Sequence, residues 1–168
     1  MTVRKPPKHA NVPLGSAIEA LKRKKFSKQK VVDLNDFKLA SAAERDRTIL
    51  VCDPSASWFN AVKRTLRSQS LNVVGVTEVE DLPASCSSRQ IDVIFLAVDW
   101  PWVCGSEICR ILKTHQETKH IAVFLVCDPD TVPSQDSLSQ SLCDDIIMRP
   151  LQGEVLQSKI DVVFSKNL

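Results

Sequence analysis

The sequence predicts an α/β fold built on a doubly wound, five-stranded parallel sheet. From Thr48 onward, apolar runs of strand length alternate with segments of helical composition. Two of these runs, Asp92–Ala97 and Ile121–Val126, are almost wholly apolar, as expected of strands that helices cover on both faces. Alternating strands and helices favour a parallel sheet with right-handed crossover connections.

The expected elements follow one another in a regular order. Strands are expected at Thr48–Cys52, Leu71–Val76, Asp92–Ala97, Ile121–Val126 and Asp145–Met148. Helices are expected near Trp58–Ser68, Val79–Ser88, Ser106–Thr114, Val132–Leu142 and Gln152–Phe164. Ligands of such sheets bind beyond the carboxyl ends of the strands, so the residues that end the strands are the candidates for a site.

The charge of the chain is distributed unevenly. Residues 1–47 hold 12 Lys and Arg against 5 Asp and Glu, a net charge of +7. The other residues hold 10 basic and 15 acidic side chains, a net charge of −5. We therefore expect a basic N-terminal extension or interaction arm, residues 1–47, followed by one α/β domain, residues 48–168. A basic arm favours an anionic partner.

The first part of the arm predicts a short helix. Ser16 and Glu19 have the spacing of a capping box, which places the helix from Ala17 to about Phe26. A basic run on this helix is a candidate contact for a partner: Lys22, Arg23, Lys24 and Lys25. We expect the residues before the helix, Met1–Pro13, to be disordered, since they are rich in Pro, Lys and small side chains.

The second part of the arm is more apolar than a solvated tether. Phe37 closes a stretch, Val31–Phe37, that we expect to be extended and to contact a partner. We expect the arm to become ordered on binding that partner. The alternative is that its apolar residues pack on the chain's own acidic domain.

The cysteines and the lack of long apolar segments indicate a cytoplasmic protein. The six cysteines form no CxxC pair and stand at no zinc-ligand spacing from a histidine: Cys52, Cys86, Cys104, Cys109, Cys127 and Cys143. No apolar run resembles a signal peptide or is long enough to span a bilayer. We expect reduced, mostly buried thiols and no metal site.

The stretch from Asp92 to Gly105, DVIFLAVDWPWVCG, resembles the third strand and following loop of response-regulator receiver domains, the CheY-like superfamily. The resemblance covers Thr48 to Leu168 and implies a flavodoxin-like sheet with the strand order 2-1-3-4-5. In that family the residue four positions before the proline is the aspartate that accepts phosphate. Here the proline is Pro101 and that position is Ala97. A methyl group cannot accept a phosphoryl group, so the resemblance implies a degenerate receiver, a pseudo-receiver.

Other positions of the implied phosphorylation site are also altered. Asp53 matches the first of two adjacent acids that hold Mg²⁺ in the family, but Pro54 replaces the second. Mg²⁺ needs several oxygen ligands and seldom binds through a lone carboxylate. Val126 stands where the family has a Ser or Thr whose hydroxyl contacts the phosphoryl group. We expect no tight Mg²⁺ site, no cofactor and no catalytic residue.

Arg149 stands where the family has the lysine that contacts phosphate, immediately before Pro150. The resemblance implies that Arg149 points towards Asp53 and that the Arg149–Pro150 peptide bond is cis. The pair is either a structural ion pair at a former active site or the remnant of an anion site.

Trp100 and Trp102 flank Pro101 on the loop after the third expected strand. One interpretation is that the rings fold over the emptied site and fill it. The other is that they anchor a partner, because Trp is enriched at the energetic centres of interfaces.

The function that we predict first is that of a non-phosphorylatable module for protein–protein interaction, localisation or scaffolding. By the resemblance, the partner or homodimer face is the region Val132–Leu168. Two other classes remain open: a signalling domain that responds to a small ligand or to redox state, and a nucleic-acid-associated regulator that uses the basic arm. An enzyme is not expected, because the chain has only 4 glycines, no phosphate-cradling loop and no Ser/His/Asp arrangement.

Overall fold

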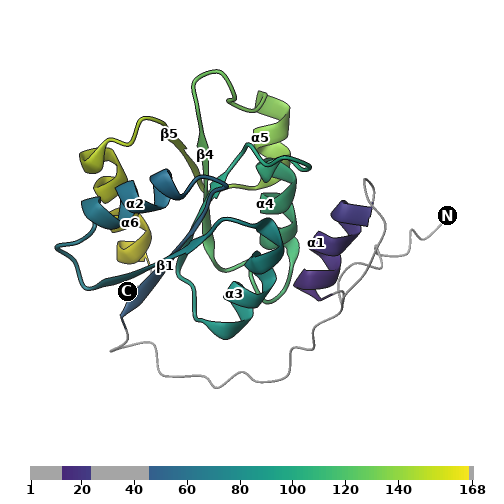
Figure 1. Ribbon diagram of the computed structural model, residues 1–168, viewed down its shortest axis with the longest axis horizontal. Helices are drawn as coiled ribbons and strands as arrows, with labels where there is room; N and C mark the ends of the chain where they lie inside the picture. The colour runs from purple at the N-terminus through teal and green to yellow at the C-terminus, as the bar shows by residue number, and fades with distance from the viewer. Residues whose placement is uncertain (1–12, 24–45, 167–168) are drawn as a thin grey trace.

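A sheet of five parallel strands, in the order β2-β1-β3-β4-β5, forms the centre of the computed structural model, which describes residues 13–23 and 46–166 (Figure 1). The strands are β1 (Arg47–Cys52), β2 (Leu71–Val76), β3 (Val93–Ala97), β4 (Ala122–Cys127) and β5 (Asp145–Met148). The fold class and the strand order expected from the sequence are confirmed.

Helices cover both faces of this sheet. They are α1 (Leu14–Arg23), α2 (Ala56–Thr65), the 3-10 turn η1 (Val79–Asp81) with α3 (Leu82–Ser88), α4 (Gly105–Thr114), α5 (Gln135–Ser141) and α6 (Gly153–Lys166). One face packs against α2 and α6, and the other against α3, α4 and α5, while α1 packs on the outside of α3 and α4 (Figure 1). The molecule therefore has three layers, with the carboxyl ends of all the strands at one edge.

The central strands carry the core. All residues of β3 are buried, and so are the residues of β4 from Val123 to Cys127. Phe95 and Phe124 are register partners, and their rings stack with centroids 5.7 Å apart on the face covered by α2 and α6. Burial of each such side chain contributes roughly 1.5–3 kcal/mol to the stability of the folded state. This burial holds the strands, and hence the residues that end them, in fixed positions.

Helix ends differ from the sequence expectation by a few residues. Helix α2 ends earlier than expected, at Thr65, and Leu66 caps it by donating its N–H to the carbonyl of Val62 at 3.0 Å. Helix α5 is shorter than expected, because Ser134 caps its start and Leu142 ends it in the left-handed conformation at φ 59°. Within residues 13–23 and 46–166, no helix is long and apolar enough to cross a membrane.

Helix α1 corrects the expectation for the first part of the arm. It begins at Leu14, so Ser16 lies inside it and does not cap it. Leu14 and Ile18, one turn apart, are each only 2% exposed and join the core beside α3 and α4. Burial of this apolar stripe therefore outweighs the capping signal, and the helix packs on the chain's own domain without any partner.

Several of the predicted partner contacts cannot be placed. Lys24, Lys25 and the stretch Val31–Phe37 lie outside the described residues. Lys22 and Arg23 form the last positions of α1, and only their backbone is described.

Candidate functional site

Three charged residues meet at the carboxyl edge of the sheet. Asp53 follows β1, Asp128 follows β4 and Arg149 follows β5. Because parallel strands end at the same edge, residues far apart in sequence become neighbours there.

Arg149 bridges the two carboxylates. Its Nη2 donates to Oδ2 of Asp53, and its Nη1 donates to Oδ2 of Asp128 at 3.0 Å. The other oxygen of Asp53 accepts the backbone N–H of Ser55 at 2.7 Å. The guanidinium carbon of Arg149 lies 5.5 Å from the ring centroid of Trp58, within range of a cation–π interaction. The predicted direction of Arg149 is confirmed, and so is the predicted cis peptide bond to Pro150.

Burial and charge act in opposite directions on Arg149. Its partial burial alone would lower the pKa, but the Asp53 carboxylate, with a contribution from Asp128, raises the pKa above its ordinary value. The guanidinium therefore stays charged. Asp53, whose side chain is 2% exposed, keeps a permanent counter-ion.

Three side chains at this edge of the sheet have no oxygen that could accept phosphate or bind a metal ion. Ala97 and Val126 are buried at 1% and 0% exposure, and Pro54 carries no oxygen in its side chain. Both oxygens of Asp53 already accept hydrogen bonds. Among the described residues, no group of three His, Cys, Asp or Glu is placed to hold a metal ion. The residues present do not fit a Mg²⁺ ion, which prefers several carboxylate and water oxygens.

A groove of about 420 Å³ opens above this bridge, and Asp53, Asp99, Asp128 and Arg149 are its charged lining. Three carboxylates against one guanidinium make the groove acidic. An anion would meet net repulsion there, which favours the structural ion pair over the anion site as the role of Arg149.

The cysteines near this edge are packed as apolar residues. Cys52 and Cys127 are 1% and 0% exposed, and burial is the largest cause that raises the pKa of each thiol. The Cys127 thiol points to the Met148 sulfur at 3.6 Å. Neither has the low pKa that marks a reactive thiol, so this arrangement gives no support to a redox site.

The two tryptophans lie elsewhere. Neither Trp100 nor Trp102 lines the groove above Arg149. Trp100 is 8% exposed, packs in the core on the α4 side, and donates its indole N–H to the carbonyl of Ala97 at 2.9 Å. The interpretation that the rings fill the emptied site is therefore wrong. The interpretation that they anchor a partner stays a prediction.

The rings line a second groove of about 600 Å³ between the β3–α4 loop and α1, which shares Asp99 with the groove above Arg149. Trp102 is half-buried there and Pro101 is exposed. Leu21, from α1, forms part of the same lining.

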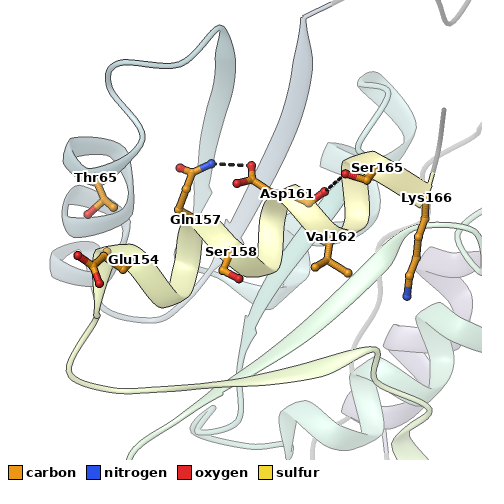
Figure 2. A pocket seen from close by; sticks show the side chains of 9 residues that line it. Thr65, Glu154, Gln157, Ser158, Asp161, Val162, Ser165 and Lys166 are labelled. Carbon is orange, nitrogen blue, oxygen red and sulfur yellow. Dashed lines mark hydrogen bonds between the residues drawn. The ribbon is translucent and has the colours of Figure 1, made fainter.

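A third groove runs along α6 and involves no residue of either site (Figure 2). It measures about 950 Å³ and has no aromatic lining. Figure 2 shows Gln157 donating to Asp161, at 2.7 Å, and the Ser165 hydroxyl bonding to the backbone of Asp161 one turn away. These polar groups satisfy one another along the helix, so we assign no small-molecule ligand to this groove.

Sequence reasoning missed two members of the Arg149 site. Asp128 follows β4 directly, so its place at a strand end was a signal that pointed to it. Trp58 has no comparable signal, because its position under Arg149 depends on how α2 packs on the sheet.

Solved receiver structures share this architecture. A response regulator from Chloroflexus aurantiacus superposes with a TM-score of 0.65 at 15% identity, over 72% of this chain and 99% of its own. The chemotaxis protein CheY4 of Vibrio cholerae gives a TM-score of 0.63 at 19% identity, over 71% of this chain and 99% of its own. The chain has the response-regulator receiver fold.

Curated relatives point to the same fold. The sensory transduction protein BceR of Halalkalibacterium halodurans is 24% identical over 119 residues, which are 70% of this chain and 50% of that protein. The sensor kinase/phosphatase CqsS of Vibrio cholerae is 24% identical over 119 residues, 17% of its length. The chain thus matches half or less of the length of these relatives. No family model matches the chain.

Proposed function

We propose that the chain is a receiver-fold interaction module that works without phosphorylation. The observation that carries the proposal is the Arg149 bridge between Asp53 and Asp128, beside a buried Ala97. The remaining charges of the phosphorylation site are bound to one another, and the acceptor is a methyl group. The fold is kept while the groups that accept phosphate and bind metal are replaced.

The surface around α5, β5 and α6 supports an interaction role. The large apolar side chains that stand out as exposed among the described residues all come from this region: Val132 at 44%, Leu142 at 50%, Met148 at 42%, Val155 at 43% and Val162 at 52%. β5 is an edge strand of the sheet. Edge strands and exposed apolar groups are common features of docking surfaces. We propose this region as the face for another protein or for a second copy of the chain.

Two features of the packing shape this face. Val155 and Val162 are seven residues apart on α6, which places them on one side of the helix. Lys159 lies between them and forms an ion pair with Asp145 of β5. The valines therefore flank the junction of the helix with the edge strand.

The cysteines support a cytoplasmic setting for the module. All six are free, and none has formed a disulfide. Reduced, buried thiols are usual in the cytosol.

The proposal is tested by incubating the protein with acetyl phosphate and Mg²⁺ and measuring its intact mass. The expected result is no change in mass, with a receiver that carries the acceptor aspartate as positive control. The Asp99→Asn variant is the matched control, because Asp99 is an exposed carboxylate two residues beyond Ala97. A phosphoryl adduct that survives on the wild-type chain would contradict the proposal.

The interaction half of the proposal is tested on the α6 valines. The Val155→Lys/Val162→Lys variant should abolish self-association, measured by sedimentation, or binding to a partner captured by the wild-type protein. Ser88→Lys/Gln116→Lys, at two exposed positions outside this face, is the control for added charge alone. Equal association of the valine variant and the wild type would contradict the proposed face.

A further inference from the structure

The loop between β3 and α4 meets a helix that precedes the five βα units of the receiver fold. Leu21 of α1 and the loop residues Trp100, Pro101 and Trp102 line the groove of about 600 Å³ described above. Apolar walls come from both segments, and α1 is held in place by the buried Leu14 and Ile18. The groove is therefore a product of the junction between α1 and the receiver core.

The loop wall of this groove is fixed before any ligand arrives. Asp99 and Cys104 form an antiparallel bridge that closes the loop. The Trp100 indole is tied to the carbonyl of Ala97. Gly105 packs so closely against the loop that a Cβ there would lie 2.1 Å from the Ala97 carbonyl oxygen. The Gly105 N–H donates to the carbonyl of Val98 at 2.8 Å. A fixed wall loses little conformational entropy on binding, so a partner would dock on a preorganised surface.

The rim of the groove is acidic. Asp99 and Glu107 line it and are both exposed. No ion pair or side-chain hydrogen bond joins either carboxylate to another described side chain, in contrast to Asp53, Asp144 and Asp145. Two exposed carboxylates in the same groove as the partly buried Trp102 favour a cation, through charge attraction and through the face of the ring.

We propose that this groove binds a short segment of another protein in which an Arg or Lys is flanked by Leu or Pro. The cationic side chain lies against Trp102 between Asp99 and Glu107, and the apolar neighbours contact Leu21 and Pro101. The proposal deepens the interaction function proposed above, since it gives the charge and the apolar character of one partner. It uses a surface separate from the α5–β5–α6 face.

The experiment uses the full chain and fluorescent hexapeptides that carry one Arg or Lys between Leu or Pro residues. Each peptide has a neutral twin in which citrulline replaces Arg, or norleucine replaces Lys. Anisotropy titrations give the dissociation constants at low and at physiological salt. At least one cationic peptide should bind about fivefold or more tightly than its neutral twin, with the difference shrinking as salt rises.

Two variants locate the binding on the molecule. Trp102→Ala should raise the dissociation constant of the cationic peptide about tenfold, as expected if the indole is an aromatic anchor at the centre of the interface. Asp99→Asn/Glu107→Gln should bring the cationic peptide close to the affinity of its neutral twin. The matched control is Glu117→Gln/Asp136→Asn, which removes two exposed carboxylates outside the groove and should leave the affinity unchanged. Thermal melting confirms that each variant is folded.

The proposal is overturned by any of three results: no cationic peptide binds, charged and neutral twins bind equally, or the groove variants bind as the wild type does. The outcome is independent of the phosphorylation test, because a phosphoryl adduct would refute the proposed function while leaving the peptide affinities as they are. A preference for acidic peptides or for nucleic acid at this groove would also refute the inference.

Discussion

At one edge of the sheet, the residues that follow β1, β4 and β5 bind one another, whereas the loop that follows β3 leaves its carboxylates open to solvent. Asp53 is 2% exposed and is held by Arg149, which also holds Asp128. Asp99, a few residues beyond β3, is exposed and has no ion pair among the described side chains. The same edge therefore contains one closed charge cluster and one open aromatic groove.

The difference follows from burial. A carboxylate removed from water is costly unless it is paired, so Asp53 needs Arg149 for the fold to be stable. An exposed carboxylate keeps its hydration and needs no partner. The comparison teaches that a buried carboxylate at the end of β1 needs a counter-ion for stability, whereas an exposed carboxylate on the β3–α4 loop does not.

The largest expected effect comes from breaking the closed cluster. Arg149→Met should lower the free energy of unfolding by about 3 kcal/mol, because it leaves Asp53 buried without its counter-ion. Urea denaturation measures the loss. Asp128→Asn is the matched control and should cost less than about 1 kcal/mol, because that side chain is 48% exposed.

A double variant separates pairing from packing. Asp53→Asn combined with Arg149→Met removes both charges and should be more stable than Arg149→Met alone. Equal losses of stability for Arg149→Met and Asp128→Asn would show that Arg149 does not stabilise the buried Asp53.

A smaller loss of stability is expected from substitution of Gly105, which packs against the backbone of the open loop. A Cβ at this position would lie 2.1 Å from the Ala97 oxygen and 2.8 Å from Cα of Val98, so the backbone would have to move. Gly105→Ala should cost about 1–3 kcal/mol and change the fluorescence of the Trp100 environment. Denaturation monitored by tryptophan emission measures both.

Gly15→Ala is the control for that change. The nearest atom to a Cβ at Gly15 is Cβ of Pro83 at 3.7 Å, an ordinary contact. Because Gly15 lies within α1, alanine should stabilise the protein by about 0.5–1 kcal/mol. Equal effects of the two substitutions would show that the loop yields easily and is not preorganised.

The smallest expected effect is a difference in reactivity between the thiols of the two regions. Cys104 is exposed on the open loop, whereas Cys52 and Cys127 are buried beneath the closed cluster. Burial raises the pKa of both buried thiols, which lowers the fraction of reactive thiolate at about pH 8. Iodoacetamide labelling followed by peptide mass spectrometry should modify Cys104 first. Labelling of Cys52 or Cys127 at the rate of Cys104 in the native protein would show that the closed region opens.

Two thiols farther from this edge extend the same test. Burial raises the pKa of Cys86 and of Cys109 to about 12. Both should become reactive only in urea, at the rate of unfolding.

Local patterns were sufficient to predict the strands, whereas their order was expected from the resemblance to receiver domains. The bounds of β2 and β5 agree with the sequence expectation, and those of β1, β3 and β4 agree to within one residue. An apolar run of strand length indicates a buried strand, and this signal lies entirely within the residues of the segment itself. The direction of Arg149 and its cis bond to Pro150 were also expected, but only as what the resemblance to receiver domains implies for this position.

Other features needed the folded chain. The start of α1 depends on burying Leu14 and Ile18 against α3 and α4, which lie far along the sequence. The second carboxylate on Arg149 is Asp128, 21 residues away, and the first is Asp53, 96 residues away. Trp100 turned into the core, while Trp102 stayed at the surface. A sequence shows which side chains are present. Ion pairs between residues far apart in sequence form only when the sheet brings the strand ends together, because charges attract strongly only over a few ångströms.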